Sequence, residues 1–252
     1  PGTPYDDSDN TFKIVDILTV SAPDGGEDWY VNGSADISWT YGLDLQGKNA
    51  TIRLAEDGSN YNILLKENYT MPGGSSTSWN YPTIGDYITP TARVKVELSS
   101  DPGNVSDATD GLFNISGTIE LVTPNGGQVW IIQEGRDINW THNGSIGDIE
   151  IQYTTDEWAG FGWINQSGVP REGNGYNWTI PVSFPINTTV KVRVRSDIDN
   201  TVNDTSDTAF TVRGILDVTY PNGGETAYVG EYFPVNWTGT GLIGNVILAY
   251  SN

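Results

Sequence analysis

The chain has 252 residues, with 12 basic and 32 acidic side chains, and its formal net charge at pH 7 is −20. Because nucleic acids and anionic membranes are polyanions, this charge argues against either of them as a partner. The sequence contains no cysteine, which excludes disulfides, thiolate metal sites and cysteine nucleophiles.

The N-terminal region is predicted to be an extension that covers residues 1–14. The chain begins at Pro1 rather than Met, and we expect a processed product or a fragment, with any signal peptide or anchor outside it. Since no apolar run in the sequence approaches the ~18 residues of a membrane helix, we expect no direct membrane insertion in this segment.

The next hundred residues alternate apolar and polar side chains with period two, which predicts strands rather than helices. In RVKVEL, for example, Val94, Val96 and Leu98 fall on one face. Turn sequences such as PDGG and EDGSN separate the strands. About seven short strands with a Trp on the second predict an immunoglobulin-like or fibronectin-like sandwich. The expected strands lie at 15–22, 35–41, 50–56, 61–67, 76–81, 92–99 and 111–116.

One block of the sequence occurs in three versions: PDGGEDWYVNGSADISWT at 23–40, PNGGQVWIIQEGRDINWT at 124–141 and PNGGETAYVGEYFPVNWT at 221–238. The copies start 124 − 23 = 101 and 221 − 124 = 97 residues apart, and such a period suits a complete small domain. We therefore predict tandem immunoglobulin-like repeats at 15–116 and 117–213, and an incomplete third repeat at 214–252.

Two further expectations concern the linkers between the repeats and the third repeat. The linkers at 113–118 and 210–214 are short, which predicts a semi-rigid rod of repeats. The third repeat stops after about 38 residues of a roughly 97-residue unit. We expect that it is truncated; the alternative is completion by a strand of another subunit, such as residues 1–16.

These repeats resemble a known family. The P-[ND]-G-G-E-x-W opening, the strand ending in W-T, the later W-x-x-P and the closing S-D-x-x-F-x-[IV] look like immunoglobulin-like repeats of prokaryotic surface proteins. They are similar to the Ser-Thr-rich, glycosylphosphatidylinositol-anchored membrane family, over nearly the whole of 17–252. The resemblance implies a stalk-like surface module. The third copy departs from the pattern, with Ala227 and Tyr228 where the others have Trp.

The repeated block itself is predicted to be structural. Its Gly-Gly pair could form a phosphate-binding nest, but no Lys or Ser/Thr follows in the required register. We expect the pairs to provide positive φ in the turn after the first strand instead. The aromatic residues Trp29, Trp130 and Tyr228 are expected to pack back on the sheet. The core is expected to hold Trp39, Trp79, Trp140, Trp178 and Trp237.

N-glycosylation acceptor sequences are unusually frequent. With 22 Asn and 45 Ser plus Thr in the chain, chance would give roughly 4 N-x-S/T sites, and there are three times as many. An Asn- and Thr-rich β surface could produce some of them by accident, but we expect a secreted glycoprotein. The predicted acceptors are Asn32, Asn49, Asn68, Asn104, Asn114, Asn139, Asn143, Asn165, Asn177, Asn187, Asn203 and Asn236.

The hairpin DEWAGFGW at 156–163 is longer than its counterpart EDGSNY in the first repeat. It places Trp158 and Phe161 at a tip with small and acidic neighbours, and exposed large aromatics mark contact surfaces. Self-association or binding to a neighbouring surface chain is the first interpretation. Stacking on glycans is the second, and packing against a domain boundary is the third.

Two acidic loops are candidate calcium sites, because calcium takes six to eight oxygen ligands. The spacing matches no EF-hand, and a chain this acidic scatters Asp widely, so we expect no cofactor and keep calcium as the alternative. The candidate ligands are Asp101, Asp107 and Asp110 in the first repeat, and Asp197, Asp199, Asp204 and Asp207 in the second.

The sequence does not favour an enzyme. The single histidine, His142, lies in the predicted turn THNGS, no G-x-S-x-G sequence accompanies it, and metal hydrolysis normally recruits several His. We therefore expect a non-enzymatic component of an extracellular stalk, sheath or filament. The expected location is the cell surface of a prokaryote, specifically of an archaeon. The alternative function is an adhesin or a carbohydrate-binding module.

Overall fold

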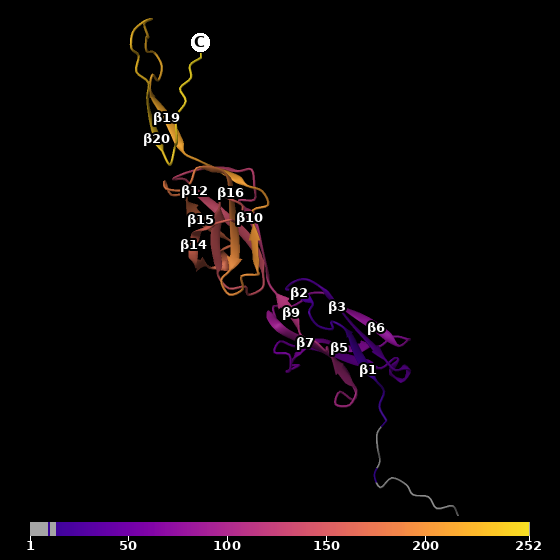
Figure 1. Ribbon diagram of the computed structural model, residues 1–252. Coiled ribbons are helices and arrows are strands. Elements are labelled where there is room, and N and C mark those ends of the chain that lie inside the picture. Colours follow the sequence, from indigo (N-terminus) through magenta and orange to yellow (C-terminus); the bar gives the residue numbers. More distant parts are fainter. Residues whose placement is uncertain (1–9, 11–13, 252) are drawn as a thin grey trace, which may run out of the picture. The chain divides into compact units, whose positions relative to one another are not determined.

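The computed structural model describes residue 10 and residues 14–251 (Figure 1). The chain divides into two compact units between Gly117 and Thr118, and each is described by itself. Among the described residues, the regular secondary structure of both units is strand, apart from the short 3-10 helices η1 (Leu43–Leu45) and η2 (Arg171–Gly173). The fold is all-β, as the period-two pattern predicts.

The first unit is an immunoglobulin-like sandwich of two sheets. One sheet has the strand order β1-β3-β6; the other has the order β2-β9-β7-β4-β5, with β8 also paired to β7. Side chains from both sheets share one buried core, which includes Val20, Trp39, Ile52, Val94 and Phe113. The strands are β1 (Leu18–Ala22), β2 (Asp28–Tyr30), β3 (Ala35–Tyr41), β4 (Asn49–Ala55), β5 (Ile63–Thr70), β6 (Ser76–Tyr81), β7 (Thr89–Leu98), β8 (Ser106–Ala108) and β9 (Phe113–Ser116).

The second unit repeats this topology with the orders β10-β12-β15 and β11-β18-β16-β13-β14, and β17 pairs with β16. A separate two-stranded sheet of β19 and β20 follows. The strands are β10 (Thr118–Thr123), β11 (Val129–Ile131), β12 (Gly135–Asn143), β13 (Ile149–Thr154), β14 (Gly162–Val169), β15 (Gly175–Thr179), β16 (Asn187–Ser196), β17 (Asn203–Thr205), β18 (Phe210–Arg213), β19 (Ile215–Tyr220) and β20 (Asn236–Thr240).

Each sandwich has two strands more than the sequence predicts. In the first repeat these are β2, which pairs in parallel with β9, and β8, which pairs antiparallel with β7. Each is three residues long, which is too short for an alternating pattern to be recognised. The predicted strands at 35–41 and 76–81 match β3 and β6.

The core tryptophans behave differently in the three copies. Trp39 and Trp140 are 0% and 1% exposed, which confirms their predicted place in the core. Trp237 is 41% exposed and Tyr228 is also exposed, so their predicted burial is wrong in this structure. The reason is that β19 pairs only with β20, and no second sheet among the described residues covers this pair.

The Gly-Gly turns adopt the predicted positive φ, with values of 125° and 84° at Gly25 and Gly26. The carboxylate of Glu27 accepts the backbone N–H groups of Asp24 at 2.6 Å and Gly25 at 2.8 Å. The Gln128 side chain accepts the N–H of Gly126 in the same way at 2.8 Å. The donors that could cradle a phosphate are therefore used by the next side chain of the turn, and the turn is structural.

Candidate contact face on the second repeat

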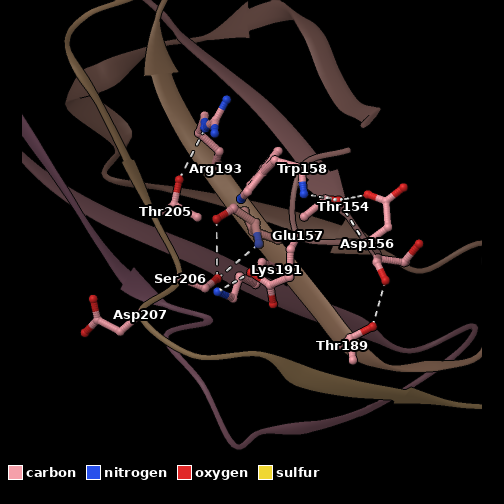
Figure 2. Close-up of polar contacts among 12 residues, drawn as sticks. Thr154, Asp156, Glu157, Trp158, Thr189, Lys191, Arg193, Thr205, Ser206 and Asp207 are labelled. Atoms are coloured by element: carbon pink, nitrogen blue, oxygen red, sulfur yellow. Dashed lines mark hydrogen bonds and ion pairs between the residues drawn. The ribbon is translucent and has the colours of Figure 1, made fainter. Parts of the chain in front are cut away.

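The hairpin between β13 and β14 is held by a small hydrogen-bond network around Thr154 (Figure 2). The Thr154 hydroxyl lies 2.7 Å from Asp156 Oδ1 and accepts the N–H of Trp158 at 3.1 Å. Asp156 Oδ1 also accepts the N–H of Gly160 at 3.0 Å. The Thr154 hydroxyl, followed by the Gly160 N–H, lowers the pKa of Asp156 because both stabilise its ionised form.

Trp158 folds back onto the sheet instead of projecting from the tip. Its φ of 69° is unusual for a bulky residue, and its ring centroid lies 3.8 Å from the guanidinium carbon of Arg193. Trp158 is therefore half-buried, and its predicted exposure is wrong because the indole forms a cation–π contact with Arg193. Phe161 is 57% exposed, as predicted.

Five side chains form what we call the arginine–tryptophan face: Gln152, Trp158, Trp163, Arg193 and Arg195. In the strand register Gln152 lies opposite both Trp163 on β14 and Arg193 on β16, and residues opposite each other share a face of the sheet. Arg195 lies over the Trp163 ring at 5.1 Å. Gln152 is only 1% exposed although it points away from the core side of β13, so its neighbours on this face cover it.

The cations of β16 differ in their partners. Arg195 Nη2 pairs with Glu150 Oε2 at 2.6 Å, and Lys191 Nζ pairs with Glu157 Oε2 at 2.9 Å. Arg193 donates through Nε to the Thr205 hydroxyl at 3.2 Å, and no carboxylate of the described residues forms a salt bridge with it. Burial, and then the charge of Arg195, lower the pKa of Arg193.

The same positions in the first repeat are arranged differently. Glu97 on β7 pairs with Arg53 Nε at 2.9 Å and with Lys95 Nζ at 2.6 Å, so a single carboxylate serves both cations. Burial raises the pKa of Glu97, but the hydrogen bonds and charges of Lys95 and Arg53 outweigh it, and the net shift is downward. The cation–π counterpart is weaker, with Lys95 Nζ 5.3 Å from the Tyr61 ring centroid.

Two of the candidate calcium ligands tie the sheets of each sandwich together, and their predicted place in loops is wrong because Asp107 lies in β8 and Asp204 in β17. Asp107 Oδ2 accepts the backbone N–H of Val20 at 2.8 Å, and Asp204 Oδ2 accepts that of Leu121 at 2.7 Å. This structural role was missed by the sequence analysis, because the partners are 87 and 83 residues apart.

The other candidate calcium ligands also take part in hydrogen bonds within their repeats. Asp101 Oδ1 accepts from the Asn104 amide, Asp197 Oδ1 from the N–H of Asp148, Asp199 Oδ1 from the N–H of Thr201, and Asp207 Oδ2 from the Asn125 amide; the Asp110 carbonyl accepts from Arg93. Within residues 10 and 14–251, no three acidic or His side chains converge in a group that could hold a metal ion. Calcium binding stays a prediction from composition.

None of the predicted glycosylation acceptors is buried. Those that are exposed are Asn32, Asn49, Asn68, Asn104, Asn139, Asn177, Asn203 and Asn236, and those that are half-buried are Asn114, Asn143, Asn165 and Asn187. Asn139 flanks the buried Trp140 in β12 and points outward, as expected from the alternation of a strand. An acceptor must be reached by the glycosylating enzyme, and this arrangement permits it.

His142 belongs to β12, opposite Ile119, and is half-buried. The prediction of an exposed turn at this residue is wrong, because β12 continues as far as Asn143. The Nδ1 atom of His142 is buried and has no hydrogen-bond partner among the described residues.

A search for membrane spans in the described part of the chain finds no helix of sufficient length and apolar character. No protein-family model matches the chain, and no match is found among the curated proteins.

Several solved structures are similar to this chain. Fibronectin(III)-like modules of Clostridium thermocellum CbhA match with 16% identity over 84% of this chain and 100% of theirs, at a TM-score of 0.24. The IG1+IG2 structure of DIP-gamma matches with 5% identity over 77% and 97%, at a TM-score of 0.30. The polymeric Ig receptor ectodomain of a teleost fish matches with 10% identity over 75% and 83%, at a TM-score of 0.33. At these TM-scores, the fold assignment rests on the strand order and register of the chain itself.

Proposed function

We propose that this chain is part of a non-enzymatic structural component of an extracellular stalk, sheath or filament, built from glycosylated immunoglobulin-like repeats at a cell surface. The proposal rests on one combined observation. The two sandwiches have the same topology, and none of the acceptor asparagines is buried. In such a protein the sandwiches provide length, and glycans together with the acidic side chains keep the exterior hydrated.

The physical argument begins with the cores. Trp39 and Trp140 are fully enclosed between their two sheets, and burial of a large aromatic side chain contributes a few kcal/mol, roughly 1.5–3, to the stability of each module. Each sandwich thus carries a core of its own, as a protein built of serial modules requires. The rod-like arrangement of the repeats stays a prediction from the short linkers.

The proposal is tested on the protein from its natural source. Peptide mass spectrometry is expected to find glycan on exposed acceptors such as Asn139 and Asn203, and electron microscopy is expected to find regular polymers. Bare peptides at all acceptor sites, together with particles that remain separate, would refute it.

An adhesin or carbohydrate-binding module is the second candidate, and the exposed Phe161 beside Trp163 favours it. The two rings meet edge to face, with centroids 5.6 Å apart and planes at 87°, and an exposed aromatic ring is a platform on which a sugar can stack. Binding on a glycan array by a chain that is monomeric in solution would favour this candidate over the first.

A further inference from the structure

Arg193 is held in place by the second repeat but has no carboxylate partner in it. The Trp158 ring covers one face of the guanidinium at 3.8 Å, and Thr205 takes the Nε–H at 3.2 Å. Its terminal nitrogens form no ion pair with any carboxylate of the described residues, whereas the flanking Lys191 and Arg195 each have one. A guanidinium held in this way keeps a planar pair of donors that matches a carboxylate.

The order of the Arg193 side chain matters for binding. An arginine that is free in solution loses conformational freedom when it binds a ligand, and this loss weakens the complex. Because Trp158 and Thr205 already fix the guanidinium, much of that loss is incurred on folding.

Gln152 is a buried polar residue on the same face. Its side chain is 1% exposed, and its Oε1 atom has no hydrogen-bond partner among the described residues. Buried polar atoms in native proteins are rarely left without a partner. Gln152 lies directly opposite Arg193 in the strand register, beneath the neighbours that cover it.

The first repeat shows what a completed version of these positions looks like. Lys95 on β7 stands opposite Arg53 on β4, as Arg193 on β16 stands opposite Gln152 on β13. In the first repeat the carboxylate of Glu97 forms an ion pair with each of the two cations from within the sheet. In the second repeat the carboxylate of Glu150 serves Arg195, so Arg193 is left for a partner from outside.

We infer that the arginine–tryptophan face of the second repeat binds an acidic segment of a second copy of this chain, whose Asp or Glu carboxylate pairs with Arg193 while Phe161 packs against its apolar atoms. The inference rests on the proposed structural function, in which copies must contact each other. Charge complementarity selects the occupant, because the chain has 32 acidic and 12 basic side chains and offers carboxylates at high local concentration in any assembly. Phe161, 57% exposed at the edge of the face, adds apolar contact area.

Sedimentation velocity on the full chain over a range of concentrations tests this inference. The wild type is expected to self-associate, and Arg193→Gln is expected to weaken the association by about tenfold or more. All variants are compared at one salt concentration of about 0.15 M, because salt screens the repulsion between two chains of net charge −20 as well as the ion pair. Phe161→Ser provides a second variant at an exposed position, where folding is not at risk, and it is expected to weaken association as well.

Lys95→Gln in the first repeat is the matched control, because Lys95 already has a carboxylate partner, and this variant should associate as the wild type does. A monomeric wild type, or an Arg193→Gln variant that associates like the wild type, would overturn the inference. Arg193-dependent binding of polygalacturonate by a monomeric wild type would also overturn it, by identifying an acidic glycan as the occupant. Mass spectrometry of the acceptor peptides is independent of all these outcomes, so the proposed function can survive the failure of this contact.

Discussion

The carboxylate of Asp204 accepts a hydrogen bond of 2.7 Å from the backbone N–H of Leu121. Leu121 lies where the register of β10 against β12 shifts, and Val20 occupies the same place in β1. Asp107 binds Val20 in the first repeat at 2.8 Å. In each sandwich a carboxylate carried by one sheet thereby satisfies a backbone donor in the first strand of the other.

Removal of this carboxylate is expected to destabilise the sandwich that contains it. Asp204→Ala leaves the part-buried N–H of Leu121 without its acceptor, which should lower the free energy of unfolding by about 1–3 kcal/mol. Asp207→Ala is the control, because the hydrogen bond between the Asp207 carboxylate and the Asn125 amide is exposed. Urea unfolding followed by tryptophan fluorescence measures both variants, and equal stability of the two would contradict this role.

The Gly-Gly turn yields a matched pair of substitutions. At Gly25 a Cβ would lie 2.6 Å from the Cα of Gly111, whereas at Gly26 nothing lies within 4 Å. Both residues have positive φ, so Gly25→Ala should cost about 1–3 kcal/mol more than Gly26→Ala, because only the former adds a backbone collision to the backbone strain. Thermal unfolding of the two variants compares them. A Gly26→Ala variant that is the less stable of the two would refute this explanation.

Glu97 predicts a pH dependence confined to the first repeat. Its pKa in the folded chain is below its ordinary value, so its contribution to stability is complete above the unfolded value of about 4.3 and is lost as the pH falls through the folded pKa. The free energy of unfolding of the first repeat should therefore decrease as the pH is lowered below about 4.3.

Glu97→Gln should flatten this acid dependence, and Glu67→Gln, at an exposed position of the same repeat, is the matched control. The effect is measured by urea unfolding at pH values between about 3 and about 7. Pulses of hydrogen exchange that report on peptides of β7 identify unfolding of the first repeat. An acid dependence that is the same in Glu97→Gln and the wild type would show that this carboxylate does not cause it.

Trp158→Leu should disturb the arginine–tryptophan face. The substitution removes the cation–π contact with Arg193, at an expected cost of about 0.5–2 kcal/mol. Phe161→Ser should change stability by less than about 0.5 kcal/mol, since surface substitutions usually have effects of that size. Tryptophan fluorescence and urea unfolding of the second repeat check both values. A larger loss in Phe161→Ser would mean that Phe161, rather than Trp158, stabilises the hairpin.

The fold could be predicted from the sequence largely because period-two alternation is a local signal. The outward Arg93 and Lys95 and the inward Val94 and Val96 are neighbours in the chain, and the structure places them on opposite faces of β7 as expected. The short strands β2 and β8 could not be predicted, because three residues contain too little pattern and their pairing depends on partners far along the chain.

The contact face was only partly predictable. The extra residues of the hairpin drew attention to Trp158 and Phe161, but the contact of Trp158 with Arg193 joins residues 35 positions apart and depends on strand register. The alternating KVRVRSD sequence at 191–197, together with the hairpin that returns over it, contained a signal for Arg193 and Arg195 on the outward face. The absence of a carboxylate at Arg193 could be recognised only from the geometry.

The most direct test of the central proposal is peptide mass spectrometry of the protein from its natural source. A glycosylated surface component predicts glycan on the exposed acceptors, with Asn139, Asn177 and Asn203 of the second repeat as the clearest cases. Asn174 is exposed in the same repeat but lies outside any acceptor sequence, and it should be unmodified. Unmodified asparagine at every acceptor would contradict the proposed function.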